Sequence, residues 1–290
     1  MNGETPRAAA TGRVRLVALD MDGTLLNSAH VVTAYTQKVV ARATEAGVVV
    51  ALSTGRCLSE LWSHLDVMPG VRYVIGESGA SVYDIAQKRM IRYVPMDDAV
   101  VDLLFDKAAP LQGMAQCFID NQSYLQFGSE EQLGPYGLSH LAGVYRAGSI
   151  FTEKLRAVCR ENRGRVEKAN FYFPSMDLRE RFARETEGFS LSVSESNGMG
   201  WEYSPLEATK ALGLEALCRY LKIDMTDTMA VGDSGNDVDM LRAAGYSVAM
   251  GNATAEARAA ADALTEDCDH DGAAKAIERA MEREEAGGRR

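Results

Sequence analysis

The chain carries near its start the stretch Leu16-Val17-Ala18-Leu19-Asp20-Met21-Asp22-Gly23-Thr24-Leu25, in which an apolar run of strand character ends in two aspartates and a Gly-Thr turn. Side chains two apart in a strand point to the same face, so Asp20 and Asp22 are expected to crowd two carboxylates at one strand end. Such a pair shares a proton, binds a hard cation, or divides into a nucleophile and an acid. At this point all three remain open.

The segments that follow alternate between strand and helix patterns. We predict a strand at 14–20, a helix at 32–46 ended by Gly47, a strand at 48–53, a helix at 58–65 and a strand at 73–75. This rhythm is typical of a doubly wound parallel sheet in an α/β protein. Ligands of such sheets bind beyond the carboxyl ends of the strands, where Asp20 and Thr54 are expected.

The rhythm changes near residue 84 and returns near residue 200. Residues 85–199 mix short strands and helices, with 128–148 expected as a loop, and predict an α+β insertion with an antiparallel sheet. A strand at 201–204, a helix at 207–221 and a strand at 228–231 are expected to resume the first domain. We therefore expect a core of residues 13–84 and 200–281, an inserted domain of residues 85–199, and flexible tails at 1–12 and 282–290.

A second turn rich in carboxylates, Gly232-Asp233-Ser234-Gly235-Asn236-Asp237, follows another apolar strand and opens a helix. A calcium loop of the EF-hand kind is excluded for the first turn, because Leu25 and Val31 stand where the required Gly and Glu would be. Alone, the second turn is equally well a helix cap. Two such turns at one sheet edge together predict an oxygen-rich Mg²⁺ site.

Two further features fit a phosphate ligand. Thr54-Gly55-Arg56 offers a hydroxyl and backbone N–H groups at a helix start, which suit a phosphate oxygen, although an N-cap Thr beside a solvated Arg has the same pattern. Lys210 lies early in a predicted helix, where a lone lysine is usually solvated. It becomes a candidate because of the other three motifs.

These four motifs, in this order, resemble those of the haloacid-dehalogenase-like phosphatases. Ser53-Thr54-Gly55-Arg56 and Met250-Gly251-Asn252-Ala253 are similar to the Cof-type (subfamily IIB) branch, and the insertion resembles its C2-type cap. The resemblance implies an α/β fold, with a Rossmann-like doubly wound parallel sheet core and an inserted α+β cap domain. The chain departs from the branch at Ser78, where Asn is usual, and this difference is expected to affect substrate preference.

The resemblance also implies roles for the candidate residues. Asp20 would attack phosphorus, and Asp22 would act as acid and then base. The implied catalytic residues are Asp20, Asp22, Thr54 and Lys210; those binding phosphate are Thr54, Gly55, Lys210 and Asn236. Those holding Mg²⁺ are Asp20, Asp22 (through its backbone carbonyl), Asp233 and Asp237. The implied reaction is Mg²⁺-dependent hydrolysis of a small phosphomonoester, a sugar phosphate or a phosphorylated cofactor, through an aspartyl-phosphate.

Two alternatives remain beside hydrolysis. A phosphomutase of the same family would use the same aspartyl-phosphate but return the phosphoryl group to a sugar. A catalytically inert protein that binds a phosphorylated ligand would not need Asp20 or Lys210, so four intact motifs argue against it.

The composition of the chain limits the classes of partner that it is expected to bind. The formal net charge of −10, from 31 Lys and Arg against 41 Asp and Glu, argues against nucleic acid or an anionic membrane as the main partner. No stretch approaches the roughly 20 apolar residues that span a bilayer. The five cysteines are odd in number and far apart, which favours a reduced compartment. We expect a cytoplasmic monomer or homodimer that binds a small phosphorylated metabolite.

Overall fold

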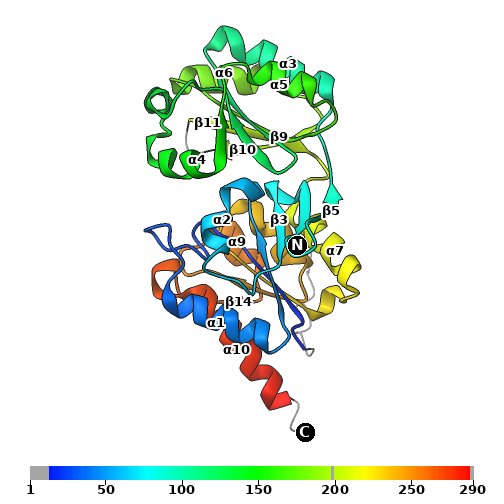
Figure 1. Cartoon of the computed structure of the whole chain (residues 1–290). Helices are drawn as coiled ribbons and strands as arrows, with labels where there is room; N and C mark the ends of the chain where they lie inside the picture. The colour runs from blue at the N-terminus through cyan, green and yellow to red at the C-terminus, as the bar shows by residue number, and fades with distance from the viewer. Residues whose placement is uncertain (1–12, 197–198, 288–290) are drawn as a thin grey trace, which may run out of the picture. The chain divides into compact units, whose positions relative to one another are not determined.

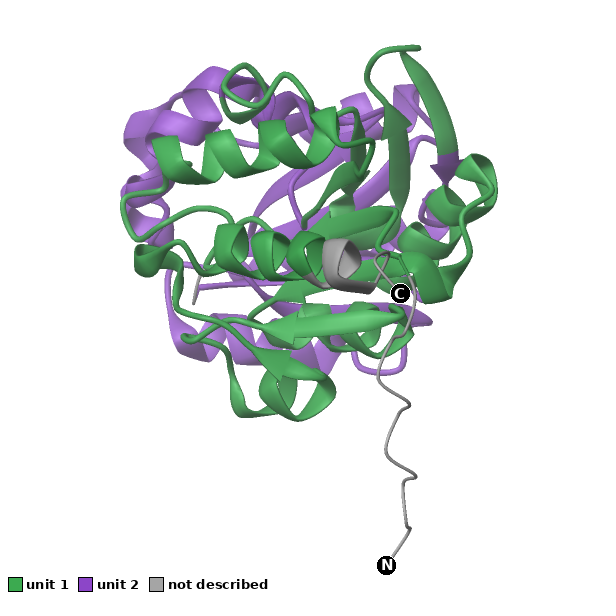
Figure 2. Cartoon of the chain, turned by 90° about the horizontal axis from the view of Figure 1, so that it is seen from below, with its two compact units in different colours: residues 1–54, 64–91, 209–290 green, residues 55–63, 92–208 purple. Residues whose placement is uncertain are grey.

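The computed structural model describes residues 13–196 and 199–287, which form two compact units. Figure 2 colours them separately: residues 1–54, 64–91 and 209–290 make the first unit, and residues 55–63 and 92–208 make the second. The expected tail at 1–12 lies outside the described residues. The expected tail from residue 282 begins inside the last helix, which continues to Gly287.

The first unit is built on an eight-stranded sheet (Figure 1). Its strands are β1 (Leu16–Leu19), β2 (Val49–Ser53), β3 (Tyr73–Gly76), β4 (Ser81–Asp84), β5 (Arg89–Tyr93), β12 (Thr228–Gly232), β13 (Tyr246–Ala249) and β14 (Ala263–Leu264). They lie in the order β14-β13-β12-β1-β2-β3-β4-β5, parallel from β14 to β3, with β4 antiparallel to β3. The buried apolar character of β1, with all four residues covered, is typical of a strand packed on both faces.

Helices cover both faces of this sheet. They are α1 (Ala34–Glu45), α2 (Trp62–Leu65), α7 (Lys210–Leu221), α8 (Val238–Ala243), α9 (Ala255–Ala260) and α10 (Gly272–Gly287). Short 3₁₀ turns accompany them: η2 (Glu77–Gly79), η6 (Met225–Asp227), η7 (Gly235–Asp237) and η8 (Cys268–His270). The turn η1 (Leu58–Glu60) belongs to the second unit. Leu16 and Ala18 of β1 share a core cluster with residues of α7, α8 and α9. Val17 and Leu19 alternate with them toward the other face, and α1 packs against β2 and α10.

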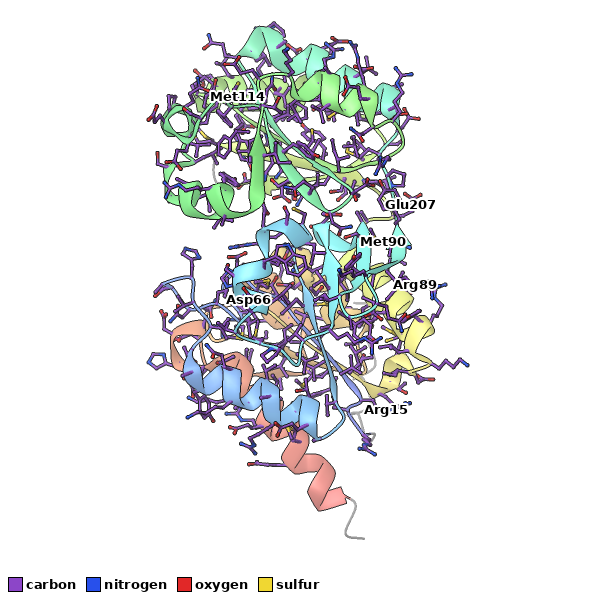
Figure 3. All side chains as sticks on the ribbon, in the orientation of Figure 1. Arg15, Asp66, Arg89, Met90, Met114 and Glu207 are labelled. Atoms are coloured by element: carbon purple, nitrogen blue, oxygen red, sulfur yellow. The ribbon has the colours of Figure 1, made fainter. Side chains whose placement is uncertain are left out.

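The second unit is α+β. Its six-stranded sheet has the order β10-β11-β9-β6-β7-β8. The strands are β6 (Met114–Ile119), β7 (Gln122–Leu125), β8 (Ser149–Phe151), β9 (Val166–Tyr172), β10 (Leu191–Ser196) and β11 (Gly200–Pro205). Figure 3 labels Met114 at the start of β6. The helices α3 (Asp98–Ala108), α5 (Leu155–Glu161) and α6 (Met176–Glu185) contribute to the apolar cluster on one face, which includes Ala115, Ala169 and Phe171.

The predicted parallel core sheet with an α+β insertion is confirmed, and two local predictions are wrong. The segment 128–148 is not a plain loop, since it forms η4 (Glu130–Tyr136), η5 (Ser139–Leu141) and α4 (Ala142–Gly148) around the buried side chains of Leu133 and Tyr145. The strand expected at 201–204 exists as β11, but it pairs with β9 and β10 in the second unit's sheet. A local pattern predicts a strand and does not say which sheet completes its hydrogen bonds.

Among the helices of residues 13–196 and 199–287, none is long and apolar enough to cross a membrane.

Candidate active site

The topology brings the ends of three parallel strands to one sheet edge. β1 lies between β12 and β2, with Leu19 level with Val231 on one side and with Leu52 on the other. The backbone N–H of Asp20 extends the pairing by donating to the carbonyl of Val231 at 3.0 Å. The chain leaves β1 toward β2 and returns on the opposite side as β12, so this edge is the switch point where doubly wound sheets bind ligands.

Lys210 reaches this edge from the start of α7. The helix begins here because the Thr209 side chain accepts a hydrogen bond from the backbone N–H of Leu212, so the expected start at residue 207 is three residues early. The Lys210 Nζ is buried and lies 2.6 Å from both Asp20 Oδ1 and Asp237 Oδ1. Gly79 permits this placement, since a Cβ there would lie 2.0 Å from the Thr209 carbonyl oxygen.

Asp237 and Asp233 are fixed by the turn after β12. Asp237 Oδ2 accepts hydrogen bonds from the backbone N–H groups of Asp233 and Ser234, each at 3.0 Å. Thr24 Oγ1 donates to Asp233 Oδ1 at 2.8 Å. As a result, carboxylate oxygens of Asp20, Asp233 and Asp237 all lie within 4.8 Å of one another.

Burial and mutual repulsion shape the electrostatics of this cluster. Burial, and next the charge of Asp237, raise the pKa of Asp20 although Lys210 opposes the shift. Burial also raises the pKa of Asp233, against the hydrogen bond from Thr24. Burial alone would lower the pKa of Lys210, but the charges of Asp20 and Asp237 outweigh it and raise that pKa. Three carboxylates with one ammonium group leave an excess of negative charge, and this oxygen donor set fits Mg²⁺.

The remaining candidates lie at different distances from the cluster. The carboxylate of Asp22 does not belong to it: its side chain is 46% exposed, and Asp22 Oδ1 lies 3.8 Å from Nδ1 of the His30 ring. Asn236 Oδ1 lies 3.5 Å from Lys210 Nζ. Thr54 is buried at the end of β2, where its backbone N–H donates to the carbonyl of Ile75 at 2.9 Å. Gly55, the next residue, groups with the second unit.

Two contributors were not singled out from the sequence. Thr24 lies inside the first motif, and a hydroxyl two residues after an aspartate was the signal that could have identified it. Ser234 forms a capping box with Asp237, in which each side chain accepts from the other's backbone. The sequence signal for Ser234 was a serine followed three residues later by an acidic residue, which is the spacing of a capping box. Both act on the orientation of carboxylates.

A doubly wound sheet with clustered carboxylates and a buried lysine at its switch point defines an α/β hydrolase of the phosphate-handling kind. The chain belongs to the haloacid dehalogenase-like hydrolases, whose family model matches residues 17–277. It is a phosphatase of the Cof type and acts on small phosphorylated substrates.

Three relatives illustrate the likeness. Phosphatase YwpJ of Bacillus subtilis is 27% identical over 90% of this chain and 98% of its own length. The HMP-PP phosphatase of Serratia proteamaculans is 30% identical over 82% of this chain and 84% of its own. The structure of the subclass IIB sugar phosphatase BT4131 shares the fold, with a TM-score of 0.75 at 21% identity over 91% of this chain and 98% of that chain.

Proposed function

We propose that this phosphatase hydrolyses a small phosphomonoester, a sugar phosphate or a phosphorylated cofactor, with Mg²⁺ and through a phosphorylated Asp20. The observation that carries the proposal is the pair of 2.6 Å contacts from Lys210 Nζ to Asp20 and Asp237. They hold one oxygen of Asp20 against a fixed cation, which orients this carboxylate and favours its ionised form against the effect of burial.

In the proposed chemistry, the carboxylates of Asp20 and Asp22 have different roles because their environments differ. Asp20 attacks phosphorus, so that a bond forms from its oxygen and the bond to the leaving oxygen breaks. Asp22, more exposed, gives its proton to the leaving oxygen and then takes a proton from the water that hydrolyses the acyl-phosphate. Lys210 and the hydroxyl of Thr54 bind the phosphoryl oxygens on which negative charge accumulates.

The metal belongs to the same proposal. Asp20, Asp233 and the backbone carbonyl of Asp22 would hold Mg²⁺, with Asp237 and Asn236 in support, and the ion would neutralise charge on the transferring group. The close approach of the carboxylates supports this assignment. It also depends on Gly23, where a Cβ would lie 2.6 Å from Asp233 Oδ2.

We further propose that the first unit is the catalytic core and the second unit a cap that provides specificity and excludes water. The division expected from sequence, 13–84 and 200–281 against 85–199, is part of this proposal. It is supported by the two compact units, between which the chain passes after residues 91 and 208.

The test is Mg²⁺-dependent release of phosphate from p-nitrophenyl phosphate. Asp20→Asn keeps the size of the side chain and removes the nucleophile, so we expect a loss of at least about a thousandfold in kcat. Asp239→Asn, on an exposed position of α8, is the matched control and should retain activity. Unchanged release by Asp20→Asn would refute the mechanism.

A further inference from the structure

A loop of residues 250–254 lies beside the second of the two turns that carry carboxylates. It follows β13, which pairs in parallel with β12. The N–H of Met250 donates to the carbonyl of Gly232 at 3.1 Å. The N–H of Thr254 donates to the carbonyl of Asp233 at 2.8 Å. The loop is therefore fixed to the backbone of the turn that follows β12.

Asn252, in the middle of this loop, reaches the first turn. Its Nδ2 donates to the carbonyl oxygen of Gly23 at 2.8 Å. Its Oδ1 accepts from the backbone N–H of Cys268 at 3.0 Å. A backbone carbonyl can only accept and a backbone N–H can only donate, so these two partners determine which end of the amide carries the nitrogen. The side chain of Asn252 is thus held in one orientation, although the residue is exposed.

The turn that contains Gly23 needs such a restraint, because glycine has more backbone freedom than any other residue. The peptide group between Gly23 and Thr24 is planar, and it is bonded on both sides. The N–H of Thr24 donates to the carbonyl of Met21 at 3.2 Å, and the carbonyl of Gly23 accepts from Asn252. With this plane fixed, only φ and ψ of Gly23 separate it from the preceding peptide group, which carries the carbonyl of Asp22.

We propose that Asn252 is a positioning residue of the active site, which acts through the turn of residues 22–24. This inference rests on the proposed function, in which the backbone carbonyl of Asp22 binds Mg²⁺. By fixing the peptide after Gly23, the Asn252 amide restrains the direction of that carbonyl. It also keeps the Thr24 hydroxyl in place to donate to Asp233 Oδ1 at 2.8 Å. One side chain of the loop thereby serves both carboxylate-bearing turns.

The first measurement is the binding of Mg²⁺ by isothermal titration calorimetry, which requires no turnover. Asn252→Ala removes the donor to the Gly23 carbonyl, and we expect the Kd for Mg²⁺ to rise about three- to tenfold. The KM for p-nitrophenyl phosphate should change less than about twofold, because the side chains proposed to bind phosphate are unaltered. A general loss of structure would raise both constants.

Asn162→Ala is the matched control. The Asn162 Nδ2 also donates to a backbone carbonyl, that of Val158 at 2.9 Å, but at the end of α5 in the second unit. Its Kd for Mg²⁺ should equal that of the wild type. Asn252→Leu has a side chain of similar size without a donor, and it should repeat the rise seen in Asn252→Ala. Thermal melting of each variant checks that it is folded.

A double variant, Thr24→Val with Asn252→Ala, tests the route of the effect. Two residues that act through one turn are coupled, so the Kd for Mg²⁺ in the double variant should rise by less than the product of the two single changes. If Asn252 only anchors its own loop to Cys268, its removal lowers the melting temperature and leaves the Kd for Mg²⁺ unchanged.

The outcomes separate this inference from the proposed function. Loss of activity in Asp20→Asn supports the mechanism whatever Asn252 does. An unchanged Kd for Mg²⁺ in Asn252→Ala, or single changes that multiply in full in the double variant, would overturn the positioning role and leave the mechanism standing. If the wild type binds no Mg²⁺, both fall together.

Discussion

Thr24 donates a hydrogen bond to a carboxylate that we propose to hold Mg²⁺. It donates to Asp233 Oδ1 at 2.8 Å and so decides which oxygen of that carboxylate remains available. Side chains that orient metal ligands in this way typically change metal affinity about 10- to 100-fold when they are removed. The first motif therefore contributes more than its two aspartates.

We predict that Thr24→Val, which keeps the shape of the side chain, raises the Mg²⁺ concentration for half-maximal activity about tenfold. The maximal rate at saturating Mg²⁺ should stay near that of the wild type. Activity measured against Mg²⁺ concentration checks this. Thr44→Val removes a comparable hydroxyl that donates to Ala41 within α1, and it serves as the control. An unshifted Mg²⁺ dependence in Thr24→Val would contradict the assigned role.

Ser78 explains, at the residue scale, why its position usually carries Asn. Its backbone is left-handed, with φ of 58° and ψ of 26°, and its N–H donates to the Thr54 carbonyl at 2.9 Å. Asn tolerates this conformation better than Ser does. Residue 78 thus shapes the backbone beside Thr54. The resemblance to the family shows that Asn is usual here, but only the backbone conformation gives the reason.

At the scale of elements, the turn between β6 and β7 is held by a buried carboxyl. Asp120 and Asn121 both have positive φ, and the N–H of Asn121 donates to Glu167 Oε1 at 3.1 Å. Burial raises the pKa of Glu167 to about 7, against the hydrogen bond from Asn121 and the charge of Arg165. The unfolded chain has the ordinary pKa of 4.5, so the folded state binds one more proton between these values.

It follows that this group makes the protein less stable as pH rises from about 4.5 to about 7, by up to about 3 kcal/mol. We predict that Glu167→Gln removes this part of the pH dependence. Unfolding in urea at pH 5 and pH 8 measures it: the free energy of unfolding should fall less between the two in the variant. Glu161→Gln should follow the wild type. Parallel pH profiles of Glu167→Gln and wild type would disprove the raised pKa.

The elements also show what could be predicted from sequence. β1, α1 and β2 were predicted from local patterns. Their order predicts that Asp20 and Thr54, which follow β1 and β2, lie at the same edge of the sheet. The partner of β11 and the turns of 128–148 depend on packing between distant segments, which short windows do not contain. For the site, the motifs singled out Asp20, Asp233, Asp237 and Lys210, which the structure brings together. Thr24 was not predicted, since its contribution depends on hydrogen-bond geometry.

On the scale of the whole molecule, the chain passes between its two units four times, after residues 54, 63, 91 and 208. Residues 55–63 therefore fold with the second unit, where Ser59 Oγ donates to the Gly148 carbonyl at 2.6 Å and Glu60 accepts from Gln116. Thr54, in the first unit, is bonded directly to this segment. One of the four crossovers of the chain therefore lies within the motif proposed to bind phosphate.

Part of the net charge of −10 is gathered where carboxylate oxygens of Asp20, Asp233 and Asp237 lie within 4.8 Å of one another. A cation that binds only the folded state stabilises it by about 2.7 kcal/mol at 100 times its dissociation constant. We predict that Mg²⁺ raises the melting temperature by several degrees at constant ionic strength. Asp233→Asn should lose most of this shift, whereas Asp239→Asn, exposed on α8, should retain it. An equal shift in both variants would mean that Mg²⁺ acts on the general charge, because a bound ion requires the oxygen of Asp233.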